Sequence, residues 1–251
     1  MSGNLLVVQA RTSSTRFPGK VLEDLDGQPM IRYQIERLRK STLVDKIVVA
    51  TSTEASDNPL SEYLHSINQP VIRGPLEDVL ARFFLVLDTY EPRYFVRITG
   101  DCPLVMPDLL DSMIQEFESS EIDYLSNVLE PSYPDGLDIE IINTSALRQL
   151  NSFDLTSTER EHVTLGIYSR PSQFKLKNFN SNFAMQEERW TVDYPEDLEF
   201  IRRIVRFEST QPELLTFSQV LNFLEDHPEQ RNTLSGSLRN EALKDWEPQH
   251  E

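Results

Sequence analysis

Three basic residues lie close together in a chain that is otherwise strongly acidic. Arg11, Arg16 and Lys20 fall within ten residues that contain no acid, although the whole chain carries a net charge of -17. Small residues surround them in "QARTSSTRFPGK" (9–20), so backbone N–H groups can approach an anion while the basic side chains add charge-assisted hydrogen bonds. The loop is therefore a candidate polyphosphate site. The alternative is a solvated loop with scattered charges.

This loop matches neither of the two common nucleotide fingerprints. A Walker A loop needs a glycine five residues before the glycine of its Gly-Lys pair and a hydroxyl residue after the lysine, but Ser14 and Val21 occupy those positions. The dinucleotide pattern G-x-G-x-x-G does not occur in the chain. Nucleotide hydrolysis on a P-loop and hydride transfer on a Rossmann fingerprint therefore lose support.

Two aspartates are candidate ligands for the Mg²⁺ that usually accompanies polyphosphates. Asp101 ends the predicted strand "RYFVRITGD", and Asp193 ends the predicted strand "RWTVD". Ligands of open α/β sheets bind beyond the carboxyl ends of the strands, where the basic loop should also lie, so we expect a single site. As an alternative, Asp193 caps the helix that Pro195 opens. We interpret Asp197 as a first-turn acid that the helix dipole favours.

Two other acid pairs compete for a functional role. Asp24 and Asp26 form the D-x-D pattern of glycosyltransferases, but Gly27 follows them and favours a hairpin turn. Asp138 and Glu140 alternate with apolar residues, which places both carboxylates on one face of a predicted strand. That face is either a substrate pocket or solvent-exposed, and we keep both acids as candidate substrate-binding residues.

The elements that must position these residues alternate between strand and helix through the first 125 residues. Short apolar runs predict strands, and amphipathic segments with helical spacing predict the helices between them. This order favours a mixed, mostly parallel α/β sheet with helices on both faces. The predicted strands cover 4–10, 46–52, 70–73 and 93–101, and the predicted helices cover 29–40, 58–67, 75–90 and 106–120.

The second half predicts further strands of the same sheet rather than a second domain. A length of 251 residues fits one large α/β domain. We expect a domain over 1–228 with an inserted lobe at about 130–185, followed by a polar tail over 229–251.

Composition excludes several classes of protein. Hydrophobic residues make up 39% and charged residues 26%, and no apolar run is long enough to span a bilayer, so we expect a cytoplasmic protein that does not bind membranes. The acidic balance repels polyanions, which argues against nucleic-acid binding. Cys102 is the only cysteine and the four histidines are scattered, which argues against a disulfide and a zinc site.

Several motifs in combination resemble one branch of the cytidylyltransferases. They are "VVQARTSSTRFPGKVL", "RGPLEDVLARF", "VRITGDCPLVMPDLLD", "EREHVT", "VDYPEDLEFI" and "HPEQRNTLSGSLRNEAL". The branch is that of the spore coat polysaccharide biosynthesis protein F, which is related to acylneuraminate and 3-deoxy-manno-octulosonate cytidylyltransferases. The resemblance implies a glycosyltransferase-A-like (Rossmann-type) fold, Mg²⁺ as cofactor, and transfer of CMP from CTP to a sugar acid with release of pyrophosphate. Similarity to the sialate enzymes also implies a homodimer.

The resemblance assigns expected roles to residues along the chain. It implies that the loop from Ala10 to Lys20 grips CTP and that "EREHVT" faces the acceptor sugar. The expected triphosphate contacts are Arg11 and Lys20, with Arg16 and Ser14 beside them; the expected nucleotide-site residues are Arg73, Asp78 and Arg82; the expected metal ligands are Asp101 and Asp193; and the expected acceptor contacts are Glu161 and His162.

Simpler interpretations and rival functions stay open at this point. Asp78 and Arg82 have the i, i+4 spacing of a helix ion pair, and His162 and Glu161 could lie on a solvated helix face. The first rival function is a nucleotidyltransferase or glycosyltransferase that uses a sugar 1-phosphate or a nucleotide sugar. The second is a catalytically silent nucleotide-binding subunit.

Overall fold

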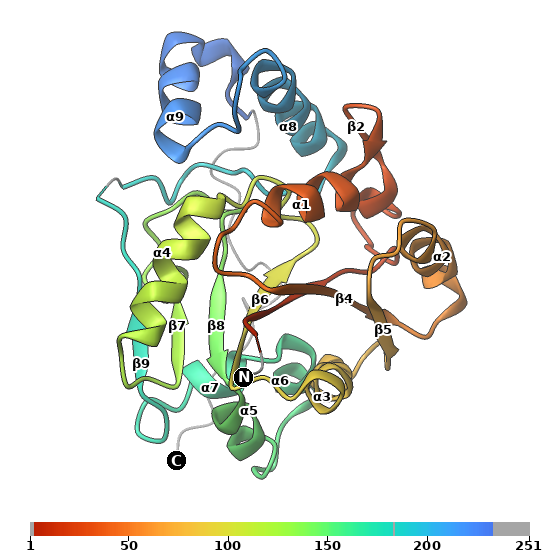
Figure 1. Cartoon of the computed structure of the whole chain (residues 1–251), viewed down its shortest axis with the longest axis vertical. Coiled ribbons are helices and arrows are strands. Elements are labelled where there is room, and N and C mark those ends of the chain that lie inside the picture. Colours follow the sequence, from red (N-terminus) through yellow and green to blue (C-terminus); the bar gives the residue numbers. More distant parts are fainter. Residues whose placement is uncertain (1–2, 183, 233–251) are drawn as a thin grey trace.

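A seven-stranded mixed sheet forms the centre of the molecule (Figure 1). The computed structural model describes residues 3–182 and 184–232. The strand order is β5-β4-β1-β6-β8-β7-β9; the first four strands are parallel, and β8 runs antiparallel to both its neighbours. The strands are β1 (Leu5–Gln9), β4 (Lys46–Ser52), β5 (Val71–Gly74), β6 (Tyr94–Thr99), β7 (Tyr124–Ser126), β8 (Glu140–Asn143) and β9 (Leu176–Asn178).

Helices cover both faces of this sheet (Figure 1). Strand β1 shows why, because Leu6 and Val8 are buried on one face while Leu5 and Val7 are buried on the other. One face carries α1 (Met30–Leu38), α2 (Asn58–Ser66), α4 (Pro107–Glu118), α8 (Pro195–Glu208) and α9 (Phe217–Asp226). The other carries α3 (Val79–Tyr90), α5 (Thr144–Leu150), α6 (Ser157–His162) and α7 (Leu165–Tyr168). The predicted fold class is confirmed.

The shorter elements lie at the ends of the larger ones. The 3-10 helices are η1 (Lys20–Leu22), η2 (Ala55–Asp57) and η3 (Pro228–Gln230), and the strands β2 (Asp24–Leu25) and β3 (Gln28–Pro29) form a hairpin. Its two-residue turn is Asp26-Gly27, with φ values of 57° and 80°. The D-x-D pattern is therefore a turn, as predicted.

The predicted strand 189–193 is not a strand. Its backbone pairs with two loops instead of a ladder: Val192 N donates to Asp101 O at 2.9 Å, and Trp190 N donates to Asp135 O at 2.6 Å. Gly136 permits this approach, because a Cβ there would lie 2.3 Å from Thr191 N. The apolar residues that suggested a strand are buried, but they belong to a coil. This coil crosses the carboxyl end of β6.

The sequence describes two other segments only in outline. Residues 130–185, expected to include an inserted lobe, supply β8 and β9 to the main sheet and α5 to α7 to one of its faces. The start of the expected tail packs onto the body, where Asn232 is buried and donates to Arg189 O at 2.9 Å. The rest of that tail lies outside the described residues.

In the part of the chain that the structure describes, no helix combines the length and apolar character needed to cross a bilayer.

Candidate active site

The basic loop lies at the carboxyl end of β1 and is tied down by a residue that the sequence did not single out. Thr12 donates to Asp57 Oδ1 through its backbone N at 2.6 Å and its hydroxyl at 2.8 Å. Gly19, with φ of 77°, closes the loop by donating its N–H to Thr12 O at 2.8 Å. Asp57 thus fixes the start of the loop, while Gly19 directs the chain into η1, where Lys20 is the first residue.

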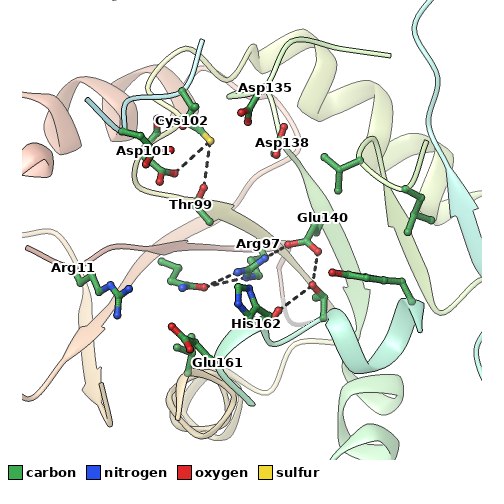
Figure 2. A pocket seen from close by; sticks show the side chains of 18 of the residues that line it. Arg11, Arg97, Thr99, Asp101, Cys102, Asp135, Asp138, Glu140, Glu161 and His162 are labelled. Atoms are coloured by element: carbon green, nitrogen blue, oxygen red, sulfur yellow. Dashed lines mark hydrogen bonds and ion pairs between the residues drawn. The ribbon is translucent and has the colours of Figure 1, made fainter. Parts of the chain in front are cut away.

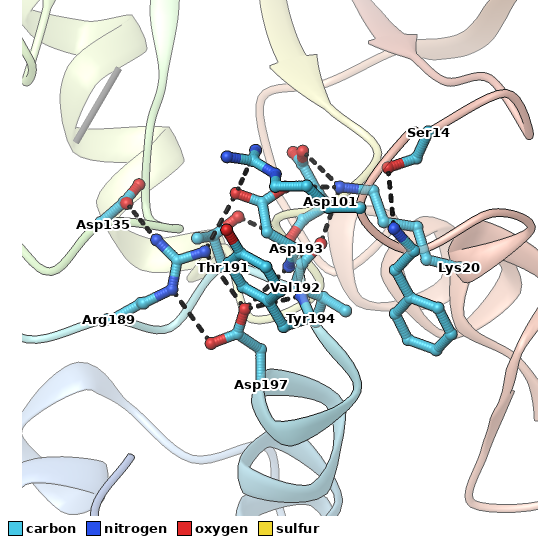
Figure 3. A network of polar contacts seen from close by, with 12 residues as sticks. Ser14, Lys20, Asp101, Asp135, Arg189, Thr191, Val192, Asp193, Tyr194 and Asp197 are labelled. Atoms are coloured by element: carbon cyan, nitrogen blue, oxygen red, sulfur yellow. Dashed lines mark hydrogen bonds and ion pairs between the residues drawn. The ribbon is translucent and has the colours of Figure 1, made fainter. Parts of the chain in front are cut away.

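Lys20 joins the two carboxylates expected to share a site (Figure 3). Its Nζ lies 3.0 Å from Asp101 Oδ2 and 2.9 Å from Asp193 Oδ1, and it also donates to Val192 O at 2.7 Å. Burial disfavours the ammonium, but the two aspartates outweigh this effect and raise the pKa of Lys20. Burial likewise opposes the charged form of Asp101, yet Lys20 and nearby hydrogen bonds lower its pKa to about 2.

A second row of charges holds Asp193 in place (Figure 3). Arg189 Nη2 donates to Asp193 Oδ2 at 3.0 Å, and Arg189 Nε donates to the fully buried Asp197 at 3.0 Å. Asn232 Nδ2 donates to the same Asp197 oxygen at 2.9 Å. Arg16 pairs with Asp193 from the solvent side at 2.7 Å. Asp193 is therefore oriented by three cations, because Lys20 contacts its other oxygen.

The helix-cap interpretation of Asp193 is wrong, and the role assigned to Asp197 is incomplete. The N-cap of α8 is Tyr194, and the carboxylate of Asp197 accepts the backbone N–H groups of Asp193 at 2.9 Å and Tyr194 at 3.0 Å. Asp197 is a first-turn acid, as predicted, but it also anchors Arg189. Asp193 is thereby left to face Lys20.

The pKa of Asp101 leads to a prediction about acid stability. Its value drops from 3.8 to about 2 in the folded protein, so the unfolded chain binds more protons between these pH values. Asp101 therefore adds stability above about pH 4 that is lost as pH falls toward 2, whereas the raised pKa of Lys20 leaves that side chain charged throughout this range. In EDTA, we expect Asp101→Asn to flatten the fall in urea-unfolding free energy between pH 5 and pH 3. The exposed Asp154→Asn should keep the wild-type slope; equal slopes in all three proteins would contradict the assignment.

A cavity of about 420 Å³ opens beside these charges (Figure 2). Arg11, Asp101, Asp193, Asp138 and Glu140 all line it; Asp138 lies just before β8, and Glu140 is the first residue of that strand. The predicted site residues along its wall are Arg11, Arg16, Arg82, Asp101, Asp138, Glu140, Glu161, His162 and Asp193. An adjoining cavity of about 480 Å³ shares several of these residues and adds Ala10, Ser14 and Lys20. The face that carries Asp138 and Glu140 is therefore a pocket.

Two predicted nucleotide-site residues do not line either cavity. Arg73 donates to Ser52 O at 2.7 Å and to Asn58 Oδ1 at 2.9 Å, so it holds the segment after β4. Asp78 accepts Ala81 N at 2.9 Å at the start of α3, and it pairs with Arg160 at 2.7 Å. Both side chains are used to position backbone near the cavity.

Arg82 reaches the cavity but makes no ion pair with Asp78. Its guanidinium donates to Pro75 O at 2.7 Å and to Leu76 O at 2.9 Å. Burial lowers the pKa of Arg82 to about 10, and the charge on Arg11 acts in the same direction. The predicted i, i+4 pair is therefore wrong, because backbone carbonyls outcompete the carboxylate for this arginine.

A strained turn directs the "EREHVT" segment toward the cavity. Helix α6 ends at His162, and Val163 adopts φ of 56° and ψ of -64°, which is rare for a β-branched residue. Thr164 N donates across this turn to His162 O at 2.6 Å. Glu161, His162 and Thr164 then line the cavity, while Glu159 caps α6. Burial lowers the pKa of His162, which favours the neutral imidazole.

Sequence reasoning missed Arg97, Arg189 and Asp57. Arg97 interrupts the apolar strand "YFVRIT", and a charge inside a buried strand is a usable signal for a functional residue. Arg189 and Asp57 carry no such signal: Arg189 lies four and eight residues from its partners Asp193 and Asp197, in a segment predicted as a strand, and Asp57 binds Thr12 from 45 residues away.

Comparisons with known proteins identify the family of this chain. Residues 5–235 match the family model described as cytidylyltransferase. The chain is 32% identical to the spore coat polysaccharide biosynthesis protein SpsF of Bacillus subtilis, over 91% of this chain and 97% of the relative.

Two solved structures are similar in fold. A cytidylyltransferase from Leptospira borgpetersenii superposes with a TM-score of 0.87 at 26% identity, over 95% of this chain and 99% of that one. A CMP:2-keto-3-deoxy-manno-octonic acid synthetase complexed with CTP superposes with a TM-score of 0.65 at 19% identity, over 82% of this chain and all of that one. The resemblance inferred from the motifs is thus confirmed: the chain belongs to the cytidylyltransferase family and is a CTP-dependent nucleotidyltransferase.

Proposed function

We propose that this enzyme transfers CMP from CTP to a hydroxyl group of a sugar acid and releases pyrophosphate, in the synthesis of a surface polysaccharide. The observation that carries the proposal is the convergence of Asp101 and Asp193 on Lys20 Nζ, beside Arg11 and Arg16 at the cavity. Support for the acceptor and the pathway comes from the CTP-bound sugar-acid synthetase and from the spore coat relative.

In this proposal the basic loop binds the triphosphate. Arg11, Arg16 and Lys20 lie along the cavity shared by Asp101 and Asp193, so they can neutralise phosphate charge at its edge. The acceptor hydroxyl oxygen attacks the α-phosphorus and a new P–O bond forms, while the bond between the α-phosphorus and the oxygen bridging to the β-phosphate breaks and the hydroxyl proton passes to solvent. The cations stabilise the charge on the departing pyrophosphate, and the loop anchored by Asp57 keeps them in position.

The two carboxylates also fit Mg²⁺. One oxygen of Asp101 and one of Asp193 lie about 3 Å from the single cation of Lys20, so both point at one centre of positive charge. In the described residues no third acid, histidine or cysteine completes a metal cluster, which suits an ion that takes its other ligands from phosphate and water. When bound there, Mg²⁺ would polarise the α-phosphate. Lys20, which occupies the shared point in the structure, would then pair with the phosphates.

The proposal places the acceptor sugar in the part of the cavity nearest β8. Asp138 lies just before β8, and Glu161 and His162 at the end of α6 line the same cavity; all three offer hydrogen-bonding groups for a polyhydroxylated ligand. The homodimer and the cytoplasmic location expected from the sequence stay predictions. Light scattering after size-exclusion chromatography measures the oligomeric state.

Nucleotide preference tests the proposal directly. A ligand that binds only the folded protein raises its melting temperature, so CTP with Mg²⁺ should stabilise the enzyme more than UTP, GTP or nucleotide sugars. Pyrophosphate should then appear when a sugar acid is added. Stabilisation by a nucleotide sugar instead of CTP would favour a glycosyltransferase, pyrophosphate release with a sugar 1-phosphate would favour another nucleotidyltransferase, and CTP binding without turnover on any acceptor would favour a silent subunit.

A further inference from the structure

We propose that Arg97 binds the carboxylate of the acceptor and thereby selects sugar acids over uncharged sugars. This inference rests on the proposed function. Arg97 lies on β6 directly opposite Glu140 of β8, and its side chain lines the cavity beside His162 (Figure 2).

Arg97 is held rigidly by neighbours on both sides. Its Nε and Nη2 donate to Gln9 Oε1 at 3.1 and 2.9 Å, and its Nη1 donates to Glu140 Oε2. Phe83 lies beneath the guanidinium, with 5.9 Å between Cζ and the ring centroid. These contacts fix the orientation of the guanidinium before any acceptor arrives, which reduces the entropy lost on binding.

The guanidinium retains donors for a ligand. An arginine has five N–H groups, and three hydrogen bonds join Arg97 to other described residues, so one N–H on Nη1 and one on Nη2 are free to donate elsewhere. The side chain is 12% exposed and borders the cavity. Two N–H groups on adjacent nitrogens suit the two oxygens of a carboxylate.

Glu140 acts as the counter-ion rather than as a sugar ligand. Its Oε1 accepts from Tyr124 Oη and from Thr164 Oγ1, both at 2.5 Å, while its Oε2 accepts from Arg97. The carboxylate therefore has a donor on each oxygen and is held against β6. Removing the charges of a buried ion pair from water costs free energy, and a protein is often no less stable when apolar residues replace the pair. A contribution to stability alone is therefore a weak explanation for the Arg97–Glu140 pair.

The other cations of the cavity have different partners. Arg189 donates to Asp135, Asp193 and Asp197, Arg82 donates to backbone carbonyls, and Arg11 and Arg16 belong to the triphosphate loop. Burial keeps His162 neutral by lowering its pKa. Among these cavity cations, Arg97 is the one whose residue lies on β6 directly opposite the first residue of β8.

Acceptor kinetics at saturating CTP test this role. We expect Arg97→Gln to raise KM for a sugar acid about 10- to 100-fold, the usual range for a lost hydrogen bond to a charged group. The Kd for CTP should change less than twofold, and Arg93→Gln, at the exposed residue just before β6, should match wild type. The wild-type preference for the acid over its amide analogue should disappear in Arg97→Gln.

Glu140→Gln separates ligand binding from a purely structural role. The amide oxygen of Gln can still accept from Arg97 Nη1, but the negative charge that competes with the acceptor carboxylate is gone, so KM for the sugar acid should stay the same or fall. A purely structural pair predicts instead that both single variants raise this KM equally. If either single variant fails to fold, Arg97→Gln/Glu140→Gln removes both charges together and should still lose the preference for the acid. Retention of that preference in Arg97→Gln or in the double variant overturns the inference while leaving the proposed function intact. If the wild-type enzyme does not release pyrophosphate with any sugar acid, both the inference and the proposed function are overturned.

Discussion

Replacing Lys20 with methionine is expected to slow pyrophosphate release by about 10²-fold or more at saturating CTP, because loss of one preorganised charge-stabilising group typically has an effect of that size. Lys20 is 6% exposed, and its ammonium is the point at which Asp101 and Asp193 converge. Methionine keeps much of the length of the side chain but leaves the two carboxylates without their shared cation. Their repulsion should also raise the pKa of Asp101 from about 2.

Two controls accompany the Lys20 variant. Lys175→Met changes an exposed lysine outside the cavity and should keep wild-type turnover. Lys20→Arg keeps the positive charge but alters its shape, so it should recover part of the lost rate. Thermal unfolding of each variant separates loss of chemistry from loss of fold. Near-normal pyrophosphate release by a folded Lys20→Met enzyme would falsify the role of this residue.

Replacing Asp197 with alanine is expected to lower the free energy of unfolding by about 3–5 kcal/mol, the cost of breaking a buried ion pair by removing one partner. Asp197 is fully buried, and it accepts from Arg189, from Asn232 and from the backbone N–H groups at the start of α8. Its loss leaves these donors without their acceptor and leaves Arg189 with less negative charge around it. Urea unfolding at neutral pH measures the difference.

Asp154→Ala is the matched control for Asp197, because Asp154 is exposed and the same atoms are removed. Its unfolding free energy should stay within about 0.5 kcal/mol of wild type, as is usual for surface substitutions. A loss of less than 1 kcal/mol for Asp197→Ala would show that the buried network adds little to stability. Because Arg189 also orients Asp193, we expect the folded fraction of Asp197→Ala to turn over more slowly than wild type.

The sequence by itself determined the order and type of most elements. Apolar runs located β1, β4 and β6, and amphipathic spacing located α1, α3 and α4 within a few residues. Because parallel strands place their following loops at one edge, the basic loop and Asp101 could be expected together. The motifs were also sufficient to identify the family. These features are local, or they follow from the topology alone.

Only the tertiary structure decided how the site is assembled. Lys20 meets Asp101 from 81 residues away and Asp193 from 173 residues away, and the segment that carries Asp193 is a coil where the pattern predicted a strand. Arg73 donates to a backbone carbonyl, and Asp78 pairs with Arg160. Arg97 is instead positioned at the cavity by its pairing with Glu140 on the neighbouring strand. The physical reason is that residue type and spacing specify which local structure a segment forms. The partner of a buried charge is instead selected by competition among all the donors and acceptors that the fold brings together.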